Sequence, residues 1–248
     1  MPTDNAGESA SRPESPSETV AIGLLGEGLT AVPGPSTTLL PDDDGGTYLR
    51  TMLTGPGTVR YAFEAPEDSV VSVARDDSVA VLDPDEALLA GFAAPVVTDA
   101  AGDELRAWWA PVEDASAPLA LDLVPEGTEG TDSSTDGRDG GGSAVAYPLT
   151  VEVYLGRDVV SGVEWGQREG GRSLAVTPTA WGRASGTTGR TYGWADVVRL
   201  EPSADTAVMR NQFLCHVDGA RQKDTWNLEP WRPDISFFRY LLARCNPT

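Results

Sequence analysis

The stretch FLCHVDGARQKDTWNLEPWRPDISFFRYLLARCNPT, residues 213–248, decides how the C-terminal part of this chain folds. It contains both cysteines, the only histidine, the only lysine and two of the seven tryptophans. Cys215 and Cys245 form either one disulfide or two buried thiols. Neither cysteine lies in a CxxC motif. A disulfide closing this loop would stabilise the region by roughly 3.5–4 kcal/mol. Such bonds persist in exported proteins, which is the reading we favour.

The same stretch predicts two helices joined by the loop DTWNLEPW. The first helix is predicted because apolar residues recur at three- and four-residue steps. Asp205 or Thr206 caps its start, and it ends near Gln222. Pro233-Asp234 begins the second, with one apolar face that is made of Ile235, Phe238, Leu241 or Leu242, and Cys245. Upstream, YGWADVVRL (192–200) predicts a third, short helix, and the Gly/Thr-rich segment 182–193 predicts a loop.

The N-terminal half has a β pattern instead. In TVRYAFEA (58–65) the residues Val59, Tyr61 and Phe63 alternate on one face, and VVSVARDDSVAVLD (70–83) predicts a hairpin around Asp76-Asp77. Turn signals recur at intervals of roughly 8–12 residues, which is typical of a sandwich, a barrel or a layered β domain. DPDEALLAG (83–91) is the one segment here that predicts a helical turn.

Composition divides the chain near residue 150. Residues 125–144, PEGTEGTDSSTDGRDGGGSA, have no apolar periodicity and form either a linker between domains or a loop within one sheet. After them, VSGVEWGQ (160–167) and SLAVTPT (173–179) predict a hairpin. We therefore expect an α+β protein. Its predicted parts are a disordered tether (1–18), a β-rich acidic domain (19–124), the linker or loop (125–144), and a small disulfide-stapled domain with a hairpin or sheet and two or three C-terminal helices (145–248).

The net charge of −20 limits the classes of partner. Nucleic acid is excluded as a partner because the acidic half would repel phosphates and the other half has no basic run. Asp42, Asp43 and Asp44 lack the ligand spacing of an EF-hand loop, and one His with two Cys is too few for structural zinc, so we predict no metal and no cofactor. No stretch of 18 apolar residues exists to span a membrane.

The opening PTDNAGESASRPESPSETV is polar and has no apolar core of a signal peptide. It is either an ordinary disordered terminus or the tether that remains after an export or lipoprotein signal has been removed. The cysteine pair favours the second interpretation, so we expect an extracellular or cell-surface protein that a removed signal could have anchored to lipid.

Several C-terminal motifs carry a family resemblance. SLAVTPTAWGR (173–183), QFLCHVDGARQKDTWNLEPWRPD (212–234) and ARCNP (243–247) resemble the domain of unknown function 2599, found at the C-terminus of exported actinobacterial proteins. The resemblance covers residues 155–248. It implies export and a Cys215–Cys245 bond, and it implies no catalytic residue. VVTDAAGDE and AYPLTVEV are similar, more loosely, to a β-rich region of other exported actinobacterial proteins.

The loop TWNLEPWRP supplies the ligand-binding candidates, which together with the histidine are Trp226, Asn227, Glu229, Trp231, Arg232 and His216. Two indoles with polar neighbours could stack on a sugar or clasp a peptide; alternatively, both indoles fill the core while Glu229 pairs with Arg232 or Arg221. His216 either packs against the disulfide and hydrogen-bonds a loop carbonyl, or acts as a general acid or base. The carboxylates Glu164, Asp218, Asp224, Glu229 and Asp234 are the candidates for glycosidase-type chemistry.

We predict a non-enzymatic binding module of the cell envelope or the extracellular space, with a cell-wall polymer or a protein as its partner. No catalytic residue is assigned. The alternatives are a hydrolase of a wall polymer and a secreted antagonist.

Overall fold

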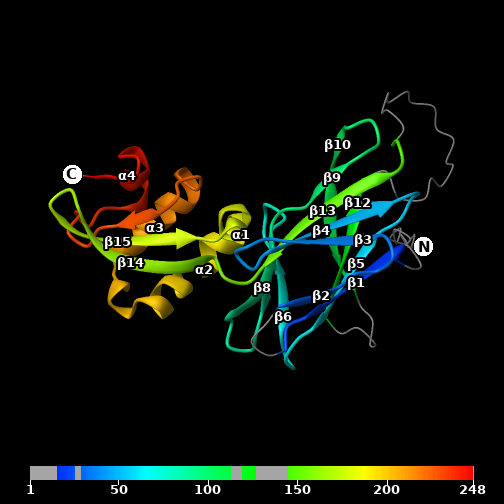
Figure 1. Cartoon of the computed structure of the whole chain (residues 1–248), viewed down its shortest axis with the longest axis horizontal. Coiled ribbons are helices and arrows are strands. Elements are labelled where there is room, and N and C mark those ends of the chain that lie inside the picture. The colour runs from blue at the N-terminus through cyan, green and yellow to red at the C-terminus, as the bar shows by residue number, and fades with distance from the viewer. Residues whose placement is uncertain (1–15, 26–28, 113–118, 127–144, 248) are drawn as a thin grey trace, which may run out of the picture.

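The structure is a computed structural model that describes residues 16–25, 29–112, 119–126 and 145–247. It has two lobes, a β-rich lobe and an α+β lobe, which lie end to end along the long axis (Figure 1). The described part of the chain is therefore α+β with a disulfide-stapled C-terminal region, as the sequence predicts.

Thirteen strands precede the α+β lobe in the described chain. They are β1 (Glu18–Gly23), β2 (Thr30–Val32), β3 (Thr37–Pro41), β4 (Thr47–Leu53), β5 (Val59–Glu64), β6 (Val70–Val73), β7 (Val79–Leu82), β8 (Leu88–Phe92), β9 (Val96–Thr98), β10 (Glu104–Leu105), β11 (Ala107–Pro111), β12 (Ala120–Pro125) and β13 (Leu149–Gly156). A five-stranded sheet has the order β11-β12-β5-β1-β2, and an eight-stranded sheet has the order β10-β9-β13-β8-β7-β6, with β4 on β13 and β3 on β4.

The two sheets share one core. The predicted alternation in β5 is confirmed, since Val59, Tyr61 and Phe63 are all buried. Tyr61 meets Phe92 of the other sheet with ring centroids 5.1 Å apart, and Trp109 packs against both rings. These inward-facing aromatic and aliphatic residues hold the sheets together as a sandwich.

Many aspartates of this lobe close their own turns. The Oδ1 atoms of Asp42, Asp83 and Asp99 each accept hydrogen bonds from the backbone N–H groups two and four residues ahead. The predicted helical turn at 83–91 is therefore wrong: Asp83 forms an Asx-type turn, and Leu88–Phe92 continue as β8. The predicted hairpin around Asp76-Asp77 is confirmed by the pairing of β6 with β7.

Strand β13 belongs to the β-rich lobe although it follows the Gly/Ser/Asp-rich stretch. It pairs with β4 from Leu149 to Leu155, and also with β8 and β9. Residues 127–144 of that stretch, and residues 1–15 of the predicted tether, lie outside the described residues. The sequence predicts that the second domain begins at residue 145. Because β13 pairs within the eight-stranded sheet of the β-rich lobe, we propose instead a boundary near residue 157, after β13.

The α+β lobe contains a three-stranded antiparallel sheet of the order β14-β15-β16, covered by helices. Its elements are β14 (Val160–Arg168), β15 (Gly171–Pro178), α1 (Ala180–Ala184), α2 (Gly186–Leu200), the 3-10 helix η1 (Pro202–Ala204), α3 (Ala207–Gly219), β16 (Trp226–Leu228) and α4 (Phe237–Leu242). The predicted hairpin is β14–β15, and the Oγ1 of the predicted cap Thr206 accepts from Met209 N–H at the start of α3.

The loop predicted at 182–193 is wrong, because α1 and α2 occupy it. The glycines there serve close packing: a Cβ on Gly193 would lie 2.6 Å from Val159 Cγ1. Of the described helices, none is both long and apolar enough to cross a bilayer; the longest, α2, has 15 residues.

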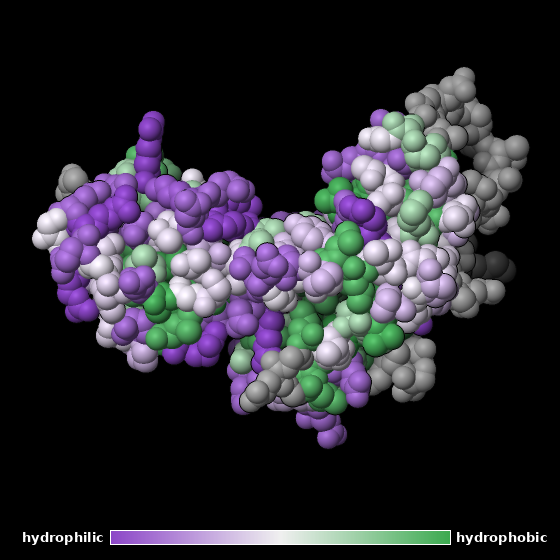
Figure 2. All heavy atoms as spheres, in the orientation of Figure 1, coloured by the Kyte–Doolittle hydropathy of each residue, from purple (hydrophilic) through white to green (hydrophobic). Residues whose placement is uncertain are grey.

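The two lobes meet at a narrow joint (Figure 2) where the β-rich lobe caps the helices of the other. Asp76 Oδ2 accepts from Thr187 N–H at 2.7 Å, at the start of α2, and Asp44 Oδ2 accepts from Ala180 N–H at 3.0 Å, at the start of α1. Trp181 is 1% exposed and its indole lies on Gly91 and Gly156, where any Cβ would overlap it. The joint is thus a packed contact.

Candidate functional site

The loop with the candidate residues begins as a strand. β16 pairs with β15 and lies beside α3, so Trp226 points into the core of the α+β lobe. Its side chain has no exposed surface and meets Phe213 edge-on at 5.5 Å between centroids. Trp226 is therefore inaccessible to a ligand in this conformation.

Gln212 of α3 holds the loop after β16. Its amide Nε2 donates to the carbonyl of Glu229 at 2.9 Å, and its Oε1 accepts from the N–H of Glu229 at 2.9 Å. Gln212 has no exposed surface, so this pair of bonds satisfies the amide and both backbone groups away from water. The loop is fixed to the helix at Glu229.

The side chain of Glu229 forms a buried ion pair. Arg232 Nε donates to Glu229 Oε2 at 2.8 Å, Nη2 donates to Glu169 Oε2 at 2.7 Å, and Nη1 donates to the carbonyl of Pro247 at 3.1 Å. The Glu229 and Arg232 side chains are 2% and 1% exposed. Burial acts against the charged guanidinium, but the bonds to the two glutamates outweigh it and raise the pKa of Arg232. Arg232 therefore ties the loop, the β14–β15 turn and the C-terminal end together.

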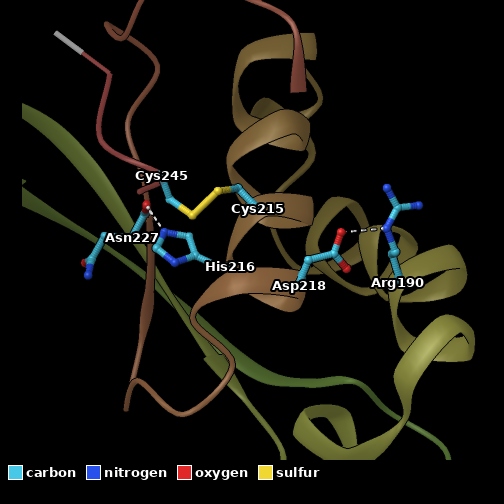
Figure 3. Close-up of a disulfide and its surroundings, with 6 residues drawn as sticks. All are labelled: Arg190, Cys215, His216, Asp218, Asn227 and Cys245. Atoms are coloured by element: carbon cyan, nitrogen blue, oxygen red, sulfur yellow. Dashed lines mark hydrogen bonds and ion pairs between the residues drawn. A yellow bond between two sulfur atoms is a disulfide. The ribbon is translucent and has the colours of Figure 1, made fainter. Parts of the chain in front are cut away.

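His216 packs beside the disulfide on α3 (Figure 3). It is 2% exposed, and its Nε2–H donates to the carbonyl of Asn227 at 3.2 Å. Burial first, and then the positive charge of Lys223, lower its pKa to about 4. The ring is therefore neutral at physiological pH, and Nδ1 has no hydrogen-bond partner among the described residues.

Cys215 and Cys245 are bonded, with Cα atoms 5.6 Å apart. Figure 3 shows the bond crossing from α3 to the chain after α4, next to His216. The disulfide is buried with Tyr240, whose hydroxyl donates to the carbonyl of Pro233 at 2.9 Å. The covalent link thus fixes α4 on α3.

Trp231 differs from Trp226 because it is 42% exposed. Its indole lies against Gly171 at the β14–β15 turn, where a Cβ would overlap it, and its Nε1–H donates to the carbonyl of Arg172 at 3.1 Å. The Arg232 guanidinium carbon lies 4.3 Å from the ring centroid. Trp231 is thus a partly exposed indole that these contacts hold in one position.

The candidate carboxylates are spread over several elements. Glu229 is buried and paired, and Asp218 forms an ion pair with Arg190 at 3.0 Å on the solvent side of α3 (Figure 3). Glu164, Asp224 and Asp234 are exposed on β14, in the turn before β16 and before α4. Within residues 16–25, 29–112, 119–126 and 145–247, no three His, Cys, Asp or Glu side chains are grouped to hold a metal ion.

Sequence reasoning missed a cavity at the joint. A space of 580 Å³ lies between the turn before β8 and helix α2, and Glu86, Arg157, Asp158, Tyr192 and Arg199 contribute to its walls. Arg199 bridges Asp158 at 3.1 Å and Asp196 at 3.2 Å across it. Its walls combine residues 86–88 with residues from 157 to 199, which come from separate parts of the chain, so no local pattern could have indicated it.

Comparisons with known proteins concern the C-terminal region. Residues 160–248 match a family model described as "Protein of unknown function (DUF2599)". Uncharacterized proteins of Mycobacterium tuberculosis (strain H37Rv) and Mycobacterium bovis are 43% identical over 97 residues, 36% of this chain and 66% of each relative. One of Mycobacterium leprae is 43% identical over 58 residues, 22% of this chain and 47% of the relative.

No solved structure matches this chain. The matched residues contain the disulfide, the buried ion pair of Arg232 and the exposed Trp231. The C-terminal region of this chain, residues 160–248, therefore carries the domain of unknown function 2599, the family that its motifs resemble.

Proposed function

We propose that this chain is an exported, non-enzymatic binding module of the cell envelope, and that Trp231 is the centre of its binding face. The observation that carries the proposal is the contrast within one loop: Trp231 is exposed and immobilised, whereas the polar candidates around it are already bonded to the protein. A rigid exposed indole offers contact area at small entropic cost.

The surroundings of Trp231 favour a polyhydroxylated or anionic polymer. Arg172, whose carbonyl receives the indole N–H, places its guanidinium 4.1 Å from the ring centroid of Trp165. Arg232 stacks on Trp231 in the same way at 4.3 Å. Arg232 is buried and paired, so its stacking holds Trp231 in place. The exposed part of Trp231 offers a flat surface for a sugar ring, and the exposed Arg172 offers positive charge for acidic groups. A cell-wall polymer has both.

The chemistry of the buried groups supports binding over hydrolysis. An acid–base catalyst needs a pKa near the working pH and access to the substrate. The pKa of His216 is lowered to about 4 by burial, and the Glu229 carboxylate is 2% exposed and bonded to Arg232. Both groups have a structural role in this loop.

Export is supported by the buried Cys215–Cys245 bond, since disulfides persist in oxidising compartments. It is also the expectation that the family resemblance carries.

The test is cosedimentation of the oxidised full chain with purified cell-wall polymer. We expect saturable binding that falls at least about tenfold in Trp231→Ala, since such anchors contribute on the order of 2 kcal/mol. The matched control is Trp108→Ala, because Trp108 is a 38% exposed indole on β11 of the other lobe. Equal binding by Trp231→Ala and the wild type would remove Trp231 from the site, and absence of wild-type binding would refute a wall polymer as the ligand.

A further inference from the structure

The outer end of the α+β lobe exposes an apolar pair. Phe238 and Leu242 are 67% and 71% exposed, the largest fractions among the large hydrophobic side chains that the structure describes. They are four residues apart on α4, so they lie on the same side of the helix. Single exposed apolar residues are ordinary, but a pair on successive turns indicates a contact surface.

The pair is held in place by the protein. Tyr240, between them in sequence, is buried on the opposite side of α4. The disulfide at Cys245 and the bond from Asn211 Nδ2 to the carbonyl of Ile235, at 3.2 Å, fix both ends of this segment on α3. The fold therefore keeps Phe238 and Leu242 in water instead of letting α4 rotate to bury them.

Positive charge lies on and beside α4. Arg239 and Arg244 are exposed on α4 and directly after it, and Arg221 and Lys223 are exposed in the turn after α3, where Lys223 shares a cavity wall with Leu241 and Arg244. Arg183 donates to the backbone carbonyls of Arg221, Lys223 and Asp224, which fixes the turn that carries two of these cations. The exposed carboxylates here are Asp224 and Asp234, together with Asp218, which is paired with Arg190, and Glu169, which is paired with Arg232. The local balance is positive in a chain whose net charge is −20.

A cavity lies next to α4 within this positive region. It has a volume of 550 Å³ between the end of α3 and the end of α4, and Lys223, Leu241 and Arg244 form part of its wall. The cavity thus joins two cationic side chains to an apolar one, an arrangement that suits a phosphate group carried on an acyl chain.

We propose that this end of the chain docks on an anionic lipid surface, with Phe238 and Leu242 entering the interface and the cations facing the phosphates. α4 lies at the end of the molecule away from the β-rich lobe (Figure 1). Residues 1–150 carry 27 acidic and 6 basic residues, so an anionic bilayer would repel that lobe and attract the opposite end. The proposal is independent of polymer binding at Trp231.

The test is flotation of the oxidised full chain with vesicles of phosphatidylglycerol and phosphatidylcholine in equal parts, and with vesicles of phosphatidylcholine alone. We expect flotation with the anionic vesicles that decreases as salt is added, because salt screens the attraction. Phe238→Ser/Leu242→Ser should lower the bound fraction at least about tenfold, and Arg239→Glu/Arg244→Glu should do the same.

The matched control is Val32→Ser, since Val32 is 65% exposed on β2 of the acidic lobe, and it should float as the wild type does. Trp231→Ala should also float unchanged, which separates lipid docking from polymer binding. Equal flotation with both vesicle types, or an undiminished bound fraction in the Phe238/Leu242 variant, would overturn the proposal. Failure of the wild type to float at low salt would overturn it too and assign the apolar pair to a protein contact.

Discussion

In the β-rich lobe several aspartates close their own turns, whereas in the α+β lobe and at the joint several polar side chains bond residues far away in the chain. Asp83 accepts from N–H groups two and four residues ahead. Gln212, by contrast, pairs with a backbone segment 17 residues away, and Asp76 caps a helix 111 residues away. The first lobe combines these turns with long strand ladders, whereas the second combines a short sheet with buried polar contacts of Gln212 and Arg232 and one covalent bond.

This difference makes the α+β lobe the more sensitive to single changes. A strand ladder distributes its hydrogen bonds over many residues, so the loss of one side chain leaves the others intact. A buried polar contact concentrates its effect, because removing one partner leaves the other unsatisfied away from water.

The largest effect should come from loss of the disulfide. We expect Cys215→Ala/Cys245→Ala to destabilise the α+β lobe by roughly 3.5 kcal/mol, because the unfolded chain gains freedom when the loop opens. The strand ladders of β4 and β5 should keep their protection. Hydrogen exchange resolved along the chain measures both. Equal loss of protection in the two lobes would show that they unfold as one unit.

An intermediate effect should come from acid acting on His216. Its folded-state pKa of about 4 lies below the ordinary 6.5, so the unfolded chain binds more protons between those values. The contribution of a neutral His216 to stability is therefore complete above pH 6.5 and is lost as the pH falls, at about 1.4 kcal/mol per pH unit.

Because His216 is the only histidine, its ring-proton NMR signal reports this directly. We expect a midpoint near pH 4 in the folded protein. His216→Gln is the control for unfolding, since glutamine lacks the titrating group and should lose the part of the pH slope that His216 contributes. A midpoint near 6.5 would contradict the buried position of the ring.

The smallest effect should come from the cap across the joint. We expect Asp76→Ala to destabilise the start of α2 by about 1 kcal/mol, the usual contribution of an N-terminal cap. Burial raises the pKa of Asp76, but the bonds from Ser78 and Thr187 outweigh it and the pKa is lowered. The contribution of the carboxylate is thus present above its ordinary pKa of 3.8 and lost as the pH falls through the lower folded value.

Amide exchange at Thr187 and Thr188 reports this cap. Asp43→Ala is the matched control, because Asp43 is an exposed acid in the turn between β3 and β4. Faster exchange in Asp43→Ala than in Asp76→Ala would mean that the negative charge of nearby carboxylates, and not the hydrogen bond to Asp76, stabilises the start of α2.

The sequence predicted the features that depend on neighbours in the chain. The alternation of Val59, Tyr61 and Phe63, the β14–β15 hairpin and the cap at Thr206 follow from local spacing and are confirmed. For α2 the local composition was misleading: its Gly/Thr-rich start is helical because Asp76 caps it and because glycines let it approach Val159. Neither cause is visible within a window of the sequence.

The candidate site was predicted only where its contacts join residues that are close in the sequence or were offered as alternatives. The pairing of Glu229 with Arg232, three residues apart, and the bond from His216 to a loop carbonyl are among the alternatives that the residues offered. The different positions of Trp226 and Trp231 were not predictable, because pairing of β16 with β15 decides which indole enters the core. Five positions separate one buried indole from one exposed indole.

The Trp181 contact at the joint has a consequence for how the chain can be divided. The indole rests on Gly91 and Gly156, and the caps on α1 and α2 come from Asp44 and Asp76. A fragment cut at the boundary between the lobes would expose the Trp181 indole to water and remove the acceptors that Asp44 and Asp76 supply at the starts of α1 and α2. The family domain begins at residue 160, so we expect it to be less stable as an isolated fragment than in the full chain.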